Sequence, residues 1–257
     1  MGVKVRIAAA GDVHASSIHR GRIEDAFGAV EDTADLVLLA GDLTAHGEPE
    51  EAEILADACR GLAIPVFAVL GNHDVHAERD RELCEVLADA GVRVLDAESA
   101  VCEVGGVQVG IVGTKGFVGG FPGSSLPDFG EPLLRRVYAA TTAEVAALER
   151  GLQEVIDADL RVVLLHYAPT DETLAGEPMG IHAFLGSARL GIPIAEYQPD
   201  LVLHGHAHAG TFEGRIGESP VYNVAIHVTG RDFYVFDLDV EVRGRTEVEV
   251  AAPPDVG

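Results

Sequence analysis

The first hundred residues alternate between short, continuous apolar runs and longer segments whose apolar positions recur every three or four residues. Runs of the first kind indicate buried strands, and segments of the second kind indicate amphipathic helices. The sequence therefore predicts strands at Val3–Ala10, Leu36–Ala40 and Val66–Leu70, and helices at Arg20–Val30, Glu48–Arg60 and His76–Ala90. This alternation is typical of βαβ units that build a parallel sheet.

After residue 91 the apolar runs become shorter. Val101–Val104 and Val107–Val112 are separated only by Gly105-Gly106, which indicates a hairpin. A strong helix is expected at Thr141–Asp157, with Thr141 and Glu144 at the spacing of a capping box. The remaining predicted strands, of which the last four are mostly antiparallel, are Val92–Leu95, Arg161–Leu165, Leu201–Leu203, Thr211–Ile216, Val221–Val224, Phe233–Leu238 and Val240–Val250.

Two segments, Lys115–Arg136 and Ala168–Gly191, are too long for simple connections and are candidate functional loops. The sequence contains no internal repeat, linker or low-complexity stretch. We therefore expect a single α/β domain over residues 1–257, with a β-rich C-terminal segment at 211–250. Two sheets packed together with helices outside would satisfy this pattern.

The charge of the chain limits its partners. Asp and Glu number 42 against 18 Lys and Arg, which gives a net charge of −24, and only Lys4 and Lys115 are lysines. Such a chain does not hold nucleic acid polymers or an anionic membrane by general electrostatics. Hydrophobic residues make up 47% of the chain, which argues against disorder.

Cysteine usage and the N-terminus favour the cytoplasm. The three cysteines (Cys59, Cys84 and Cys102) form no CxxC pair, and an odd count suits a reducing compartment. No run approaches the ~20 apolar residues of a membrane helix. The apolar run near the N-terminus leads directly into candidate site residues, so we interpret it as a strand rather than a signal peptide.

Five predicted strands end in polar residues of one chemical kind. They run into Gly11-Asp12-Val13-His14, Gly41-Asp42, Gly71-Asn72-His73-Asp74, His166 and His204-Gly205-His206-Ala207-His208. Because loops at the carboxyl ends of parallel strands converge on one crevice, we expect these side chains to lie together.

Their types and spacing favour a metal site. Residues i and i+2 of an extended segment point the same way, so Asp12 with His14, and His206 with His208, can each offer two ligands. Mixed imidazole and carboxylate ligands suit Zn, Fe, Mn or Ni better than Ca or Mg. Seven candidate ligands are too many for one ion and fit two ions that share a carboxylate.

The order of these blocks, DxH, GD, GNHD, H and GHxH over residues 12–208, resembles the calcineurin-like metallophosphoesterase family. The resemblance implies a four-layer αββα sandwich with two mixed sheets flanked by helices. It also implies two transition-metal ions (Fe, Mn or Zn), with Asp42 bridging both. The remaining ligands would be Asp12, His14 and His208 for the first ion, and Asn72, His166 and His206 for the second.

The same resemblance assigns the catalytic groups. His73 would stabilise the transition state or protonate the leaving oxygen, and Asp74 would orient the His73 imidazole. Many members read GDxxD in the second block, whereas this chain reads Gly41-Asp42-Leu43-Thr44-Ala45. Any supporting contact made elsewhere by the second acid must therefore come from another residue. The GDLT form resembles the branch that includes cyclic-nucleotide phosphodiesterases.

The expected function is hydrolysis of a small phosphate ester by in-line attack of a metal-bound hydroxide. A small diester, cyclic nucleotides included, is the leading substrate. The alternatives are a phosphomonoesterase or phosphoprotein phosphatase, then a nuclease, and finally a non-catalytic scaffold of the same fold that has lost its metals.

Other polar residues have simpler interpretations. The candidate ligands themselves could be turn residues and helix caps, since Asp and Asn often occupy such positions. His204 alternates away from the metal face and is expected in the core. Arg135 and Arg136 could pair with phosphate or begin a helix. Five further histidines are expected at the surface or the rim of the site, with His46 and His182 as weaker substrate contacts: His19, His46, His76, His182 and His227.

Overall fold

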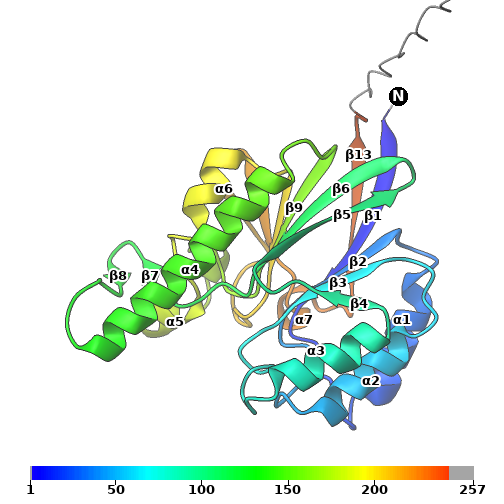
Figure 1. Cartoon of the computed structure of the whole chain (residues 1–257), viewed down its shortest axis with the longest axis horizontal. Helices are drawn as coiled ribbons and strands as arrows, with labels where there is room; N and C mark the ends of the chain where they lie inside the picture. The colour runs from blue at the N-terminus through cyan, green and yellow to red at the C-terminus, as the bar shows by residue number, and fades with distance from the viewer. Residues whose placement is uncertain (1, 243–257) are drawn as a thin grey trace, which may run out of the picture.

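The protein is described by a computed structural model over residues 2–242, and it consists of two sheets stacked face to face with helices on both outer faces (Figure 1). The first sheet has four parallel strands and one edge strand antiparallel to β1. Its order is β13 (Tyr234–Val240), β1 (Val3–Ala10), β2 (Leu36–Ala40), β3 (Val66–Val69) and β4 (Val92–Val94).

The second sheet is also mixed. Its four inner strands are parallel, and its two edge strands are antiparallel to their neighbours. Its order is β11 (Glu213–Ile216), β12 (Ser219–Asn223), β10 (Leu201–His204), β9 (Leu160–Leu164), β6 (Val107–Gly113) and β5 (Glu98–Val104).

Helices cover the outer face of each sheet. In Figure 1, α1 (Arg20–Val30), α2 (Pro49–Cys59) and α3 (Asp80–Asp89) lie over the first sheet at the lower right. On the left, α4 (Pro132–Glu154) and α6 (Gly191–Tyr197) lie over the second sheet. The predicted four-layer αββα sandwich is thus confirmed. None of the described helices is long and apolar enough to cross a bilayer.

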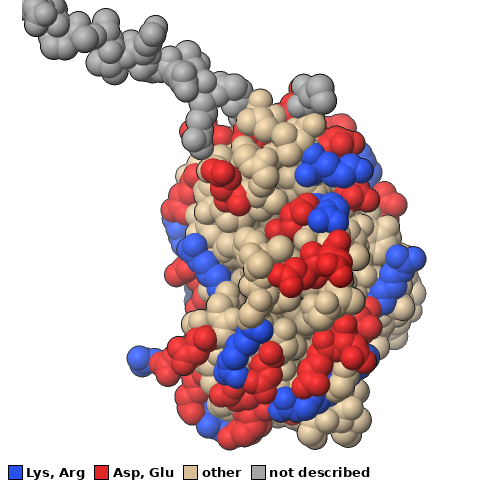
Figure 2. All heavy atoms as spheres, turned by 90° about the vertical axis from the view of Figure 1, so that its right-hand side faces the viewer, with Lys and Arg blue, Asp and Glu red and all other residues tan. Residues whose placement is uncertain are grey.

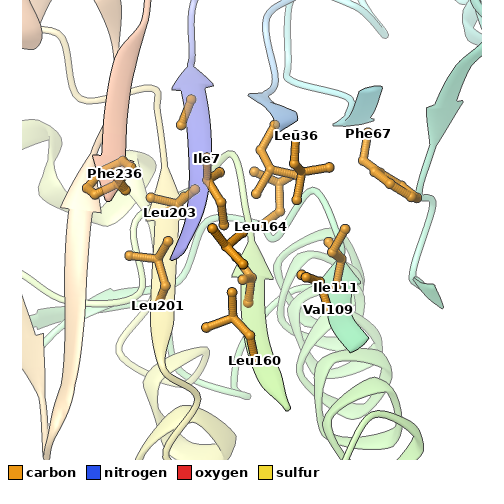
Figure 3. Close-up of a cluster of buried hydrophobic side chains, with 14 of the residues drawn as sticks. Ile7, Leu36, Phe67, Val109, Ile111, Leu160, Leu164, Leu201, Leu203 and Phe236 are labelled. Atoms are coloured by element: carbon orange, nitrogen blue, oxygen red, sulfur yellow. The ribbon is translucent and has the colours of Figure 1, made fainter. Parts of the chain in front are cut away.

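The main hydrophobic core lies between the two sheets (Figure 3). Ile7 and Leu36 of the first sheet face Leu164 and Leu203 of the second, and all four side chains are fully buried. Alternate residues of β1 and β2, such as Leu39, instead pack against the helices. Both faces of these strands are therefore buried, which explains why they form continuous apolar runs in the sequence.

Short elements complete the end of the sandwich to which the parallel strands point. They are β7 (Gly120–Phe121), β8 (Ser124–Ser125), the 3-10 helices η1 (Glu172–Leu174) and η2 (Met179–Ile181), α5 (His182–Leu185) and α7 (Ile226–Thr229). β7 and β8 belong to the predicted loop at 115–136, and η1, η2 and α5 belong to the loop at 168–191.

Two predicted helix starts are wrong. α3 begins at Asp80 rather than His76, because the chain forms turns through residue 77 and residues 78 and 79 are not helical. α4 begins at Pro132, in a region we expected to be loop, and Pro is well suited to the first turn of a helix. Residues 132–136 at the start of α4 are all exposed, so they carry no apolar periodicity that could reveal this end of the helix.

The predicted capping box at Thr141 and Glu144 is also wrong, since both residues lie inside α4. The Thr141 hydroxyl donates to the Val118 and Val137 carbonyls, and Glu144 accepts a hydrogen bond from the Gly116 N–H at 3.0 Å. These side chains tie the helix to the loop that follows β6.

The C-terminal strands agree in part with the prediction. β13 continues through Val240, whereas the rest of the predicted strand Val240–Val250, from residue 243 onward, lies outside the described residues. α6 was not predicted as a helix beyond Gly191. That residues 1–257 form one domain remains a prediction.

Candidate metal centre

The seven predicted ligands converge at the carboxyl ends of five strands. Backbone hydrogen bonds join the loops there: the Asp12 N–H donates to Gly41 O at 3.0 Å, and the His14 N–H donates to Asp42 O at 2.9 Å. The Gly205 N–H donates to His166 O at 3.1 Å, which links the two strand ends of the second sheet. The loops are therefore held in fixed relative positions by their main chains.

The backbone itself is strained at this site. Asp12, His14, Asp42 and His206 have φ values of +59°, +47°, +47° and +69°. Such conformations cost a non-glycine residue about 1–3 kcal/mol and persist only where surrounding contacts enforce them.

Three glycines leave room for the ligand side chains. A Cβ on Gly71 would lie 2.0 Å from Asp42 Oδ1, and a Cβ on Gly205 would lie 2.4 Å from Asp12 Oδ2. At Gly41, where φ is +79°, a Cβ would lie 2.5 Å from the His166 ring. Glycine is therefore required immediately before Asp42, Asn72 and His206, because the backbone at each of these glycines lies directly against the side chain of a candidate ligand.

A first group of ligand atoms comes from Asp12, His14 and His208, all within 4.8 Å of one another. His208 Nε2–H donates to Asp12 Oδ1 at 2.8 Å, and the His206 N–H donates to Asp12 Oδ2 at 2.9 Å. Burial would raise the pKa of Asp12, but the hydrogen bond from His208 and the nearby imidazoles lower it to about 2. Asp12 is therefore ionised at neutral pH.

A second group comes from Asp42, His166 and His206, also within 4.8 Å. His166 is fully buried, and its Nδ1–H donates to the Ala40 carbonyl at 3.0 Å. Burial lowers the pKa of His166 to about 3, so the ring is neutral and Nε2 carries only a lone pair.

That lone pair faces two more acceptors. Asn72 Oδ1 lies 2.9 Å from His166 Nε2, and Asp42 Oδ1 lies 3.3 Å from it. With the single proton of neutral His166 on Nδ1, where the Ala40 carbonyl accepts it, Nε2 has no hydrogen to donate to Asn72 or Asp42. His166 Nε2, Asn72 Oδ1 and Asp42 Oδ1 thus lie close together with no hydrogen of His166 between them. Such a group of electron-pair donors is suited to binding a cation.

A backbone carbonyl also sets the tautomer of His206. Its Nε2–H donates to the Phe184 carbonyl at 3.2 Å, which leaves Nδ1 as the free ligand atom. Burial lowers the pKa of His206, so the ring is neutral at pH 7. The backbone carbonyls of Ala40 and Phe184 therefore select the tautomers that a metal requires.

Asp42 lies between the two groups. Its Oδ2 is 3.9 Å from His14 Nε2 and 3.9 Å from His73 Nε2, while Oδ1 faces His166. Burial, together with the charges of Asp12 and Asp74, raises the pKa of Asp42 to about 8. Neither Asp12 nor Asp42 forms an ion pair with a Lys or Arg of the described residues. The donor set thus fits metal cations.

Asp74 does not contact the His73 ring, so the expectation that it orients this imidazole directly is wrong. The buried Asp74 carboxylate accepts hydrogen bonds from the N–H groups of Leu43, Thr44 and Gly71 and from the Thr44 hydroxyl. These donors fill its acceptor positions. Asp74 instead ties the loop after β2 to the loop after β3.

His73 is oriented by a main-chain group. Its Nδ1–H donates to the Ala45 carbonyl at 2.7 Å, and its Nε2 faces Asp42. Ala45 occupies the position of the missing acid of the GDxxD block, and its backbone oxygen is the partner of the His73 ring. The His73 N–H also donates to Asp42 Oδ1 at 2.9 Å.

Several other predicted residues have structural roles. His204 is buried as expected, and its Nε2 accepts from the Thr173 hydroxyl at 2.8 Å. His182 Nε2–H donates to the Glu177 carbonyl, and His46 pairs with Glu51. Arg135, at the exposed start of α4, pairs with Asp128.

Three residues of the site were not assigned a role from sequence. His227 was expected at the surface or the rim, and its ring stacks on His208 with centroids 4.1 Å apart. Tyr167 places its ring centroid 4.5 Å from that of His206. Lys115 Nζ lies 5.3 Å from the Tyr167 ring centroid. Two features of the sequence pointed to Lys115: lysine is rare in this chain, and Lys115 begins the candidate functional loop Lys115–Arg136.

A family model described as calcineurin-like phosphoesterase matches residues 5–210. A probable cyclic nucleotide phosphodiesterase of a Synechococcus strain is 46% identical over 50 residues. That match covers 20% of this chain and 19% of the relative, so the chain matches about a fifth of the relative's length.

Two solved structures have similar folds. A phosphopantetheinyl hydrolase from Mycobacterium tuberculosis superimposes with a TM-score of 0.69 at 15% identity, over 99% of this chain and 100% of that one. A protein of Thermus thermophilus gives a TM-score of 0.59 at 18% identity, over 92% and 99% of the two chains.

The pKa of Asp42 makes metal affinity depend on pH. Below pH 8 Asp42 binds a proton that a metal must displace, so affinity for Mn²⁺ should rise by up to about tenfold per pH unit from about pH 6 to about pH 8. Calorimetric titration with Mn²⁺ would measure this. In Asp42→Asn, which has no such proton, affinity should be weaker and its pH dependence shallower. Equal wild-type affinity at both pH values would contradict this interpretation.

Replacing Gly71 by Ala should displace the Asp42 carboxylate and weaken Mn²⁺ binding by about 10- to 100-fold. Gly28→Ala is the matched control, because a Cβ there meets nothing within 4 Å and α1 continues through it. The control should bind Mn²⁺ like the wild type and be equally stable or slightly more stable. Wild-type affinity in Gly71→Ala would show that the close contact does not position Asp42.

Proposed function

The chain belongs to the calcineurin-like phosphoesterase family of metal-dependent phosphoester hydrolases, and from that premise we propose that it uses two metal ions to hydrolyse a small phosphodiester. The observation that carries this proposal is the position of Asp42, a buried carboxylate with one oxygen facing His166 and the other facing His14 and His73. A carboxylate with ligand groups on both sides suits two ions that share it.

The proposed ligand sets follow the two groups of donor atoms. Each set combines imidazole nitrogens with carboxylate or amide oxygens, a mixture that suits Fe, Mn or Zn. Asp42 would be common to both sets, with Asp12, His14 and His208 holding one ion and Asn72, His166 and His206 holding the other.

When bound, the ions would supply Lewis acidity toward the phosphate and lower the pKa of a water molecule. Side chains of the protein would supply the proton transfer and the positioning of the reacting groups. We assign His73 the transfer of a proton from Nε2 to the leaving oxygen, since Nδ1 is held by Ala45 and Nε2 faces Asp42. His73 acts in this role as the imidazolium. Asp74 supports the reaction indirectly, by holding the loops that carry Asp42 and His73.

A diester is favoured over a monoester by the similarity to a probable cyclic nucleotide phosphodiesterase and by the GDLT sequence of the second block. A long polyanion is disfavoured by the charge of −24. Figure 2 shows acidic side chains over much of one face, with basic ones interspersed. Such a surface repels nucleic acid polymers but leaves a small ester free to enter.

We also propose a cytoplasmic location, because Cys59, Cys84 and Cys102 are all free thiols. Burial raises the pKa of the Cys59 thiol to about 12, which makes it a poor nucleophile. A role in packing follows for this residue.

The substrate proposal is tested with a panel of cyclic nucleotides, bis-p-nitrophenyl phosphate and p-nitrophenyl phosphate, assayed with Mn²⁺. We expect the highest kcat/KM with diesters. A preference for the monoester would favour the phosphomonoesterase alternative. A protein that binds no metal and hydrolyses none of these esters would be the non-catalytic scaffold.

Two variants separate catalysis from metal binding. His73→Ala should lower kcat by about 10²–10⁴-fold with metal content unchanged, because the ring acts on the substrate. Asp42→Ala should lose metal and activity together. Elemental analysis and turnover of bis-p-nitrophenyl phosphate measure both properties. Full activity in either variant would contradict the assigned roles.

A further inference from the structure

Lys115 lies at the carboxyl end of β6, next to the strand that carries His166. Its carbonyl accepts hydrogen bonds from the N–H groups of His166 and Tyr167, each at 3.1 Å. The main chain at Lys115 is therefore fixed relative to one of the proposed metal ligands.

The Lys115 ammonium is held against two aromatic rings. Nζ lies 4.7 Å from the centroid of Phe117 and 5.3 Å from that of Tyr167. The Tyr167 ring in turn contacts the rings of His166 and His206, with centroids 5.4 Å and 4.5 Å away. The two rings stabilise the charge on one side and place it beside the proposed second ion.

This ammonium lacks the partner that other cations of the protein have. Arg6, Arg60 and Arg79 each form ion pairs with carboxylates. Lys115 forms no ion pair within residues 2–242, and the one hydrogen bond of Nζ goes to the Gly116 carbonyl at 3.3 Å. Burial lowers the pKa of Lys115, and the charges of Glu144, Asp96 and Asp42, none of which forms an ion pair with Nζ, only partly offset this effect.

We propose that Lys115, supported by Phe117 and Tyr167, forms an anion-binding subsite beside the metal centre, and that its ammonium binds a nonbridging oxygen of the substrate phosphate. The inference rests on the proposed function and adds a recognition element to it. Of the two lysines, only this one faces the site, since Lys4 is exposed on β1 and pairs with Asp237. An ammonium carries its charge on a compact group with three donors, which suits a tetrahedral oxyanion.

The two-lysine composition allows a direct chemical test. Reductive methylation of the Mn²⁺-loaded protein, followed by peptide mass spectrometry, reports the modification rate at Lys115 and Lys4 separately. Inorganic phosphate at about ten times its Kd should slow modification of Lys115 by roughly tenfold, because about nine tenths of the sites are occupied. Lys4 should react at an unchanged rate, and chloride at equal ionic strength should protect neither.

Variants test the same point without chemical modification. Lys115→Met keeps the apolar stem and removes the charge, and it should weaken binding of inorganic phosphate by about tenfold while metal content stays the same. Lys115→Gln should weaken phosphate binding to the same extent. Agreement between the two variants would show that the loss is due to the missing charge and not to a packing defect in one of them. Lys4→Met is the matched control and should bind phosphate like the wild type.

The inference fails if phosphate does not protect Lys115, or if both Lys115 variants bind phosphate within twofold of the wild type. Hydrolysis of esters by the wild type together with that result would overturn the subsite and leave the proposed function standing. Protection of Lys115 in a protein that hydrolyses none of the esters would support the subsite and overturn the function.

Discussion

The structure depends on one electrostatic constraint, which is that the buried carboxyl group of Asp42 faces three histidine side chains and forms no ion pair with a Lys or Arg of the described residues. His166 donates its one proton to Ala40, so its other nitrogen faces Asn72 and Asp42 as an acceptor. In a protein interior an unpaired carboxylate is costly unless a proton or a cation neutralises it, and burial accordingly raises the pKa of Asp42 to about 8. A bound metal ion would take the place of that proton. The carbonyls of Ala40 and Phe184 fix the tautomers that leave one nitrogen of His166 and of His206 free for such an ion, and the carbonyl of Ala45 orients His73.

The fold meets this constraint by joining two sheets through a single apolar core. Ile7, Leu36, Leu164 and Leu203 hold the sheets together, and the strand ends above them carry the candidate ligands. Four of the candidate ligands adopt positive φ, so part of the stability of the core offsets the strain of the site. Asp74 connects the loops after β2 and β3, which couples the positions of Asp42 and His73.

Much of this could be predicted from sequence, for a physical reason. The strands β1 and β2 and the helix α1 have the predicted bounds, because the strands are buried on both faces and form continuous apolar runs, while α1 buries one face at helical spacing. Residues 132–136 at the start of α4 are all exposed and gave no such signal. That the candidate ligands lie together could be predicted from the parallel topology of the strands. The hydrogen-bond partners of His73 and Asp74 could not be predicted, because they are backbone groups of neighbouring loops, and residue type alone does not say which backbone groups a loop brings near.

Diffraction from crystals grown with Mn²⁺, recorded to locate anomalous scatterers, would show whether two ions share Asp42. We expect two anomalous peaks in contact with Asp42, one beside Asp12, His14 and His208 and the other beside Asn72, His166 and His206. A single peak, or none in contact with Asp42, would contradict this expectation.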